Sequence, residues 1–191
     1  MHSIERRLAA MAFALLGGVA LLTSPARADE FRLHSSDIVN QMVKQDQVQS
    51  SNYGAGCSGG NLSPHLDWEN APQNAQSFVL TVFDKDAPNG MGWFHWVVVN
   101  IPNTVNSLPP GASGDGAVEA TGAIQTRTDF GTPGYGGPCP PVGTAHRYIF
   151  TITALRVSKI PVDQEATPAL VSIFIEANKI ASASFTAIYA R

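Results

Sequence analysis

The sequence of 191 residues has few charged residues and few cysteines, and each shortage excludes a class of protein. Charged residues make up 14% of the chain and hydrophobic residues 44%, so a sizeable core is expected and long disordered segments are not. Two cysteines, Cys57 and Cys139, are too few for a disulfide-dense mini-scaffold. The length and the absence of internal repeats predict one globular domain.

The chain also lacks an apolar run long enough to cross a bilayer. The stretch from Ala9 to Leu22 is roughly 14 residues, whereas a span needs about 20. It follows Arg6-Arg7 and precedes Ala26-Arg27-Ala28, which is the order of charge, apolar core and small-residue cleavage site in a signal peptide. We therefore predict a signal peptide at residues 1–28, a mature domain at 29–191 and a periplasmic or secreted location.

No basic cluster is present in the predicted mature chain. Residues 29–191 contain nine Lys and Arg against fourteen Asp and Glu, a net charge of −5. Nucleic acids and anionic lipid surfaces are held by clustered Lys and Arg. We expect no nucleic-acid partner and no integral membrane segment after processing, while a small anion held by a few local groups remains compatible with the composition.

The two cysteines allow three interpretations. An exported chain meets an oxidising compartment, which favours a structural disulfide between Cys57 and Cys139. Neither cysteine belongs to a CxxC pair, and Cys57 has no histidine nearer than His65. A metal site and a free or catalytic thiol remain as the alternatives. We assign no metal and no cofactor.

The hydrophobic pattern predicts a mainly β domain. Short runs rich in β-branched and aromatic residues indicate buried strands, and they occur at residues 77–83, 94–101, 147–155 and 183–190. Helix signals are confined to one place, where Thr167 can cap a helix that starts with Pro168. Apolar residues recur there at Leu170, Phe174, Ala177 and Ile180, which predicts a helix of about 12 residues.

A first polar group follows the first predicted strand. Asp84 and Asp86 flank Lys85 in the motif Asp-Lys-Asp-Ala-Pro, which ends at Pro88, and His95 lies near the start of the next strand. A carboxylate beside an imidazole can fix its tautomer and hold it charged, which suits anion binding or acid–base catalysis. The alternative is a solvated turn in which aspartate serves the turn geometry.

A second group lies in the glycine- and proline-rich segment that starts at Gly134 and leads to His146-Arg147-Tyr148. Glycine allows successive backbone N–H groups to point into one concavity and bind an anion. The segment is not a P-loop, because the pattern GxxxxGK[ST] is missing. The alternative is a tight connection without a ligand.

Taken together, these segments resemble the phosphatidylethanolamine-binding protein family, in its bacterial Raf kinase inhibitor-like branch. The resemblance covers nearly the whole predicted mature chain. Its motifs are Asn61-Leu62-Ser63-Pro64 with Trp68, Asp84-x-Asp86-Ala87-Pro88, Gly92 to Pro102 (GWFHWVVVNIP), Gly134-Tyr135-Gly136-Gly137, Pro140-Pro141 and His146-Arg147-Tyr148.

The resemblance implies antiparallel sheets with one or two peripheral helices and a pocket at one rim that takes phosphate-like or phosphorylethanolamine-like groups. It further implies that His95, His146 and Asp84 line this pocket and that the Gly136-Gly137 backbone closes it. The positions that match the family's ligand-binding residues are Asp84, Asp86, Pro88, Trp93, His95, Gly137, Pro140, His146 and Tyr148.

Two positions depart from the family pattern. Lys85 stands where the acidic motif usually has proline, so the backbone there is less fixed. Cys139 directly precedes Pro140, and a bond to Cys57 would pin this loop to the segment around Asn61.

The sequence favours an exported binding protein that holds a small phosphorylated or similar anionic group. One alternative is a protein-interaction or inhibitor module in which the pocket is incidental, with an unknown protein partner. The other is a hydrolase that uses His95 or His146 as a base, although no GxSxG or HExxH motif and no Ser-His-Asp order is present. We assign no catalytic residue, and export argues against inhibition of a cytoplasmic kinase.

Overall fold

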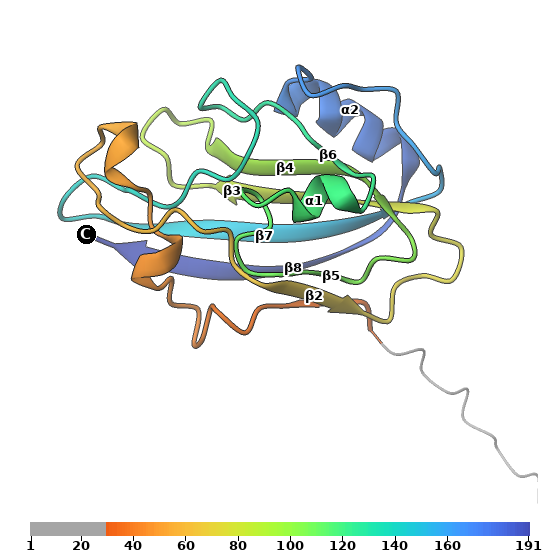
Figure 1. The fold of residues 1–191 in the computed structure, drawn as a ribbon, viewed down its shortest axis with the longest axis horizontal. Coiled ribbons are helices and arrows are strands. Elements are labelled where there is room, and N and C mark those ends of the chain that lie inside the picture. Colours follow the sequence, from red (N-terminus) through yellow and green to blue (C-terminus); the bar gives the residue numbers. More distant parts are fainter. Residues whose placement is uncertain (1–29) are drawn as a thin grey trace, which may run out of the picture.

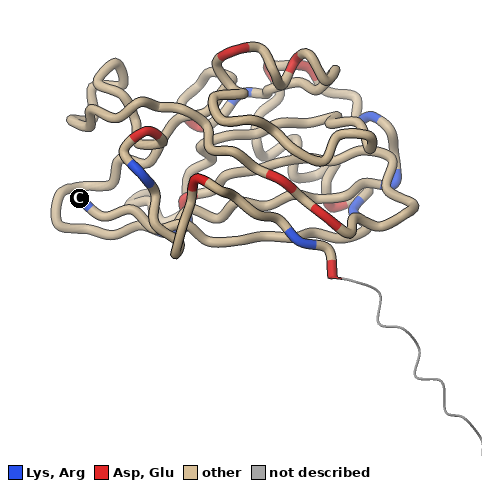
Figure 2. Tube along the Cα trace, turned by 60° about the horizontal axis from the view of Figure 1, so that its bottom comes forward, with Lys and Arg blue, Asp and Glu red and all other residues tan. Residues whose placement is uncertain are grey.

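The computed structural model describes residues 30–191 (Figure 1). The predicted signal peptide at residues 1–28 lies outside the described residues, so its cleavage stays a prediction. Within the described part of the chain, no helix is long and apolar enough to cross a membrane. The lysine and arginine positions of this part are scattered along the trace (Figure 2).

The domain is mainly β with two short α-helices, which confirms the predicted fold class. The N-terminal third holds short elements only: strand β1 (Arg32–His34), the 3-10 turns η1 (Gln45–Gln47) and η2 (Ser51–Tyr53), and strand β2 (Leu66–Glu69). The remaining elements are β3 (Ser77–Asp84), β4 (Trp93–Pro102), β5 (Ser107–Leu108), α1 (Ala117–Ala120), β6 (Ile124–Gln125), β7 (Ala145–Leu155), α2 (Pro168–Asn178) and β8 (Lys179–Ala190).

Two sheets organise these strands. A five-stranded sheet has the order β6-β4-β3-β7-β8 and a three-stranded sheet has the order β1-β2-β5, with every pairing antiparallel. The central strand β3 lies between β4 and β7, and its last residue, Asp84, faces Trp93 on one side and Tyr148 on the other. The end of β3 and the beginnings of β4 and β7 therefore meet at one rim.

Successive side chains of a strand point to opposite faces of the sheet, and in the central strands β3 and β4 both sets are largely buried. On one face Leu80, Trp96 and Phe150 pack with Trp68 of the small sheet. On the other face the strand residues pack beneath α2, which contributes Val171. Each fully buried side chain of this size stabilises the fold by about 1.5–3 kcal/mol. The strands whose ends form the rim are therefore held in place by the core on both faces.

Helix α2 begins as predicted and ends earlier. Thr167 caps it by accepting a hydrogen bond from the Leu170 N–H at 3.3 Å, and Pro168 is the first helical residue. Ile180, which the apolar spacing placed on the helix, belongs instead to β8, since the helix ends at Asn178 and Lys179 already pairs with Leu155. Strand pairing with β7 thus overrides the helical period over the last turn.

Candidate functional site

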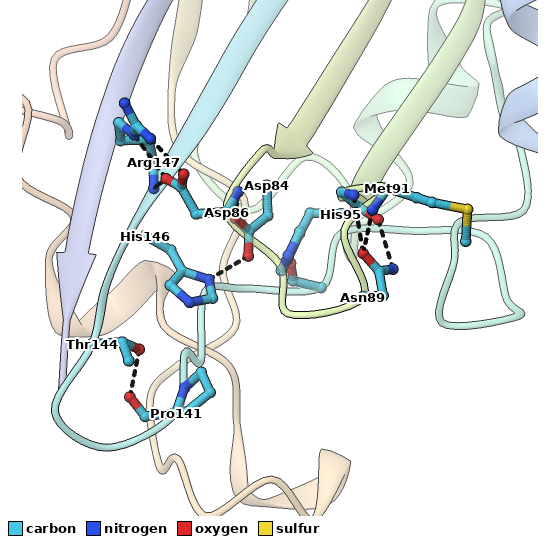
Figure 3. A network of polar contacts seen from close by, with 11 residues as sticks. Asp84, Asp86, Asn89, Met91, His95, Pro141, Thr144, His146 and Arg147 are labelled. Atoms are coloured by element: carbon cyan, nitrogen blue, oxygen red, sulfur yellow. Dashed lines mark hydrogen bonds and ion pairs between the residues drawn. The ribbon is translucent and has the colours of Figure 1, made fainter.

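A pocket of about 470 Å³ opens at the rim where β3 ends and β4 and β7 begin, a volume within the usual range for small-ligand sites. Figure 3 shows the polar groups at this rim. The predicted site residues that line the pocket are Asp84, Pro88, Trp93, His95, Pro140, His146 and Tyr148. Asp86 and Gly137 are not part of its lining.

Asp84 and His146 form a buried pair in the pocket wall. The Asp84 Oδ2 atom lies 2.7 Å from His146 Nδ1, and both side chains are almost fully buried. Because a carboxylate only accepts hydrogen bonds, Nδ1 carries a hydrogen and donates a hydrogen bond to Asp84. The Oδ1 atom of Asp84 accepts from the Asp86 N–H at 2.9 Å. Both oxygens are held, so the imidazole is fixed with Nε2 left for a ligand.

His95 is oriented by the glycine-rich loop. Its Nδ1 lies 2.6 Å from the Gly136 carbonyl oxygen, to which it donates, and the Gly136 N–H donates back to the His95 carbonyl at 2.9 Å. The ring packs edge-on against Phe130 and Tyr148. Burial lowers the pKa of His95, so its imidazole is neutral at pH 7 and Nε2 is a hydrogen-bond acceptor.

The two backbone N–H groups expected to close the pocket, those of Gly136 and Gly137, have partners within the protein. The Gly137 N–H donates to the Asn61 Oδ1 at 2.8 Å, and the Gly136 N–H is already bonded to His95. A Cβ atom on Gly137 would lie 2.2 Å from the Gln47 carbonyl oxygen. Glycine is needed at this position for the close approach of two backbone segments, and the loop orients His95 through the Gly136 backbone.

Asp86 lies outside the pocket lining and is bonded to Arg147. It forms a two-pronged ion pair with Arg147, whose Nε lies 2.7 Å from Oδ2 and whose Nη2 lies 2.5 Å from Oδ1 (Figure 3). The Arg147 N–H adds a third bond at 2.9 Å. The side-chain hydrogen bonds from Arg147 lower the pKa of Asp86 to about 2. Asp86 thus fixes the loop after β3 to the start of β7, which restrains the backbone although Lys85 replaces proline.

The predicted disulfide between Cys57 and Cys139 is present, with its sulfur atoms 2.03 Å apart. No free cysteine occurs in the described part of the chain. Cys139 belongs to the pocket wall, so the crosslink joins the N-terminal loop to the glycine-rich loop at the site. Among residues 30–191, no group of three or more His, Cys, Asp or Glu side chains could hold a metal ion.

Several wall residues lie outside the motifs that the sequence singled out. Two of them are Tyr53 and Phe130, whose rings pack edge-on with centroids 5.3 Å apart. The predicted residue Trp93 contacts Phe130 in the same way at 5.5 Å, and these three rings contribute to the apolar wall. Gln49 and Arg191 supply further polar groups. Gln49 lies between the turns η1 and η2, and Tyr53 is the last residue of η2. No local spacing identifies either of them or Arg191.

The arrangement combines an apolar wall with a few fixed polar atoms, of which His146 Nε2 and His95 Nε2 are the best oriented. With both ring nitrogens protonated, His146 would donate a charge-assisted hydrogen bond from Nε2. His95, in contrast, offers an acceptor. The geometry is suited to holding a small polar group that both accepts and donates hydrogen bonds.

Comparisons with known proteins agree with this architecture. Residues 40–190 match the family model described as phosphatidylethanolamine-binding protein. The UPF0098 protein YbcL of Escherichia coli is 47% identical over 174 residues, which cover 90% of this chain and 93% of YbcL. YbhB of the same organism is 48% identical over 136 residues, or 71% of this chain and 86% of YbhB.

Solved structures show the same fold. The crystal structure of Escherichia coli YbcL, described as a new member of the mammalian PEBP family, has a TM-score of 0.80 and covers 85% of this chain and 99% of that chain. The homolog CT736 from Chlamydia trachomatis is 28% identical, with a TM-score of 0.71, over 84% of this chain and 97% of that chain. By sequence and by fold, the chain belongs to the phosphatidylethanolamine-binding protein family.

Proposed function

We propose that this protein is an exported binding protein that holds a small phosphorylated or similar anionic group in the rim pocket. The observation that carries the proposal is the buried Asp84–His146 pair, which directs Nε2 of a fixed imidazole toward the pocket. A phosphoryl oxygen accepting from that nitrogen gains a charge-assisted hydrogen bond, which is about twice as strong as a neutral one.

Family membership supports a binding protein over an enzyme. A hydrolase that worked through a covalent intermediate, with His95 or His146 as the base, would need a hydroxyl or thiol nucleophile beside it. The described pocket wall contains no serine or threonine, and its cysteine, Cys139, is held in the disulfide. The described pocket wall thus supplies oriented hydrogen-bonding groups but no serine, threonine or free thiol for His95 or His146 to activate.

A protein-interaction role is a second candidate, and one observation favours it. Met91 and Val142 are 83% and 76% exposed, and each lies within two residues of a pocket-lining position, Asn89 and Pro141 respectively. Exposed apolar side chains beside a pocket are common in protein interfaces. Such a surface could seat a protein whose side chain enters the pocket.

The test is a melting curve of the protein with inorganic phosphate and with phosphorylethanolamine. A ligand at 100 times its dissociation constant stabilises a protein by about 2.7 kcal/mol, so a clear increase in melting temperature is expected. His146→Ala should remove the increase, whereas His34→Ala is the matched control because His34 is exposed and pairs only with Glu69. No increase with millimolar probes would contradict the anion-binding proposal and favour the interaction role.

Export is tested separately. The intact mass of the protein recovered from the periplasmic or secreted fraction should correspond to a chain that begins at Asp29. A mass that still includes residues 1–28 would contradict processing at the predicted site.

A further inference from the structure

The segment of residues 54–58 forms one side of the rim pocket and has few backbone bonds. Ala55 lines the pocket, and Cys57 forms the disulfide with Cys139. Within the described chain, residues 55–58 make no backbone–backbone hydrogen bond. The position of this part of the wall therefore depends on side chains.

Two side-chain contacts hold the 54–58 segment. One is the disulfide, and the other is Arg191, whose Nη1 donates to the Ala55 carbonyl at 3.0 Å and whose Nη2 donates to the Gly56 carbonyl at 2.8 Å. Arg191 follows β8, at the end of the molecule where the turns η1 and η2 also lie (Figure 1). Gly54 and Gly56 have φ angles of 73° and 81°, and glycine changes its backbone conformation at little cost. The segment can therefore move once these contacts are lost.

The chain on both sides of the segment is attached to the glycine-rich loop independently of the disulfide. The Gln49 N–H donates to the Pro138 carbonyl at 3.2 Å. The Asn61 side chain donates to the Tyr135 carbonyl at 2.9 Å and accepts from the Gly137 N–H at 2.8 Å. These bonds remain when the sulfur–sulfur bond is broken. Reduction should therefore release the 54–58 segment and leave the rest of the pocket wall in place.

Cys139 is the more accessible of the two sulfur atoms and lies beside a cation. It belongs to the pocket wall and is partly buried, whereas Cys57 is 8% exposed. The Arg191 Nη1 lies 3.4 Å from the Cys139 sulfur, and no ion pair found among residues 30–191 involves this guanidinium. A cation beside a disulfide attracts an incoming thiolate and stabilises the thiolate that is released. Accessible disulfides are also the more readily reduced ones.

We propose that the Cys57–Cys139 disulfide is a site of thiol–disulfide exchange, at which a dithiol reductant releases the 54–58 segment and opens the pocket. A thiolate of the dithiol attacks the Cys139 sulfur, the sulfur–sulfur bond breaks, and its electron pair leaves on Cys57, which takes up a proton from water. The second thiol of the reductant loses its proton and attacks the reductant's own sulfur in the mixed disulfide. Cys139 then leaves as a thiolate beside Arg191. The protein gains two electrons and the dithiol becomes a disulfide.

The effect on binding rests on the proposed function, whereas the exchange itself does not. A released segment no longer closes its side of the pocket, so a bound ligand loses contacts in the wall. Phosphorylethanolamine should therefore bind to the reduced protein about tenfold more weakly than to the oxidised protein.

The main test compares backbone order parameters, measured by NMR, in the oxidised protein and in the protein reduced with dithiothreitol. Those of residues 55–58 should fall below about 0.6 on reduction, the range of flexible backbone, while those of Gln49 and Gly137 stay near 0.85. Cys57→Ser/Cys139→Ser should match the reduced protein without any reductant. Unchanged order parameters at residues 55–58 would contradict the proposal, and so would unfolding of the whole domain on reduction.

A second test identifies the reacting sulfur. With the monothiol 2-mercaptoethanol, peptide mapping should find the mixed disulfide on Cys139, and a mixed disulfide on Cys57 would contradict the proposed direction of attack. Arg191→Lys and Arg191→Ala both lose the guanidinium fork, and only the lysine keeps the charge. The lysine variant should therefore be reduced severalfold faster than the alanine variant, and added salt should diminish the difference. Equal rates at low salt would refute the role of the charge.

Arg156→Ala is the matched control for these rates. The Arg156 guanidinium also donates to two backbone carbonyls, those of Asn178 and Lys179, but it is not part of the rim pocket. Its removal should leave the rate of reduction unchanged.

Binding separates the failure of this inference from that of the proposed function. If the oxidised and reduced proteins bind phosphorylethanolamine equally well, the segment does not control the pocket, and the inference is wrong while the proposed function stands. If neither form binds the probe but residues 55–58 become mobile on reduction, the proposed function is wrong and the exchange site stands.

Discussion

The disulfide allows the sharpest stability prediction, because the size of its effect follows from the chain separation alone. Cys57 and Cys139 are 82 residues apart, and the chain-entropy model gives about 4.5 kcal/mol for a crosslink that closes such a loop. Small domains unfold with about 5–15 kcal/mol. Replacing both cysteines by serine should therefore remove a large share of the free energy of unfolding without changing the order of strands.

Urea unfolding followed by tryptophan fluorescence measures this loss. With a slope of about 2 kcal/mol per molar urea, the midpoint of Cys57→Ser/Cys139→Ser should fall by about 2 M relative to the oxidised wild type. The wild-type protein kept in reductant is the control and should lose nearly the same amount, because it also lacks the crosslink.

A loss below about 1 kcal/mol, with the slope unchanged, would refute the reasoning. It would mean that the unfolded chain gains little freedom when the bond is absent. The affinity for phosphorylethanolamine should fall in the same variant, since the bond fixes the loop that carries Cys139 and Cys139 belongs to the pocket wall.

Three further predictions concern the site. Gly137→Ala should destabilise the protein by more than about 2 kcal/mol in urea unfolding, because the new Cβ would meet a backbone oxygen 2.2 Å away, whereas Gly114→Ala meets its nearest atom at 3.8 Å and should be nearly neutral. The Asp86–Arg147 pair lowers the pKa of Asp86 to about 2. The stability that the pair contributes is therefore present above the pKa of Asp86 in the unfolded chain and should be lost as the pH falls through 2. Because the pair is largely solvated, Asp86→Asn should cost only about 1 kcal/mol of the free energy of unfolding at pH 7 and nothing at pH 1.5. Burial lowers the pKa of His95. The stability that His95 contributes is therefore present above about pH 6.5 and should fall below that pH, because the unfolded chain then takes up a proton. His95→Asn should show a smaller decrease in melting temperature than the wild type as the pH falls below about 6.5, and an unchanged decrease would contradict a neutral His95.

The long strands were predictable because their patterns are strong. The segments at 77–83, 94–101 and 147–155 lie within β3, β4 and β7, and each has several buried β-branched or aromatic residues. Strands β1, β2, β5 and β6 span two to four residues, which is too short for a period to appear. The sequence also gives no strand order, because pairing depends on packing between segments far apart in the chain.

The site was predictable only in position. Motifs identify residues at strand ends, and the antiparallel order of β3, β4 and β7 brings these ends together. The direction of a side chain in a turn is not set by spacing, so the acidic motif alone does not predict that Asp86 turns toward Arg147. The sequence does not predict Gln49 and Arg191 at the pocket, because they come from segments far apart in the chain that meet only in the folded protein.

Asp84 shows why the site belongs to the fold itself rather than to a movable loop. It is the last residue of the central strand, and its pairing with Trp93 and Tyr148 fixes the starts of both neighbouring strands. One carboxylate oxygen holds the following turn and the other holds His146. A shift of the register by one residue would turn every side chain of the strand to the opposite face. The same pairing that buries the core therefore sets the direction of the imidazole, and no change in the pocket loops is needed to orient it.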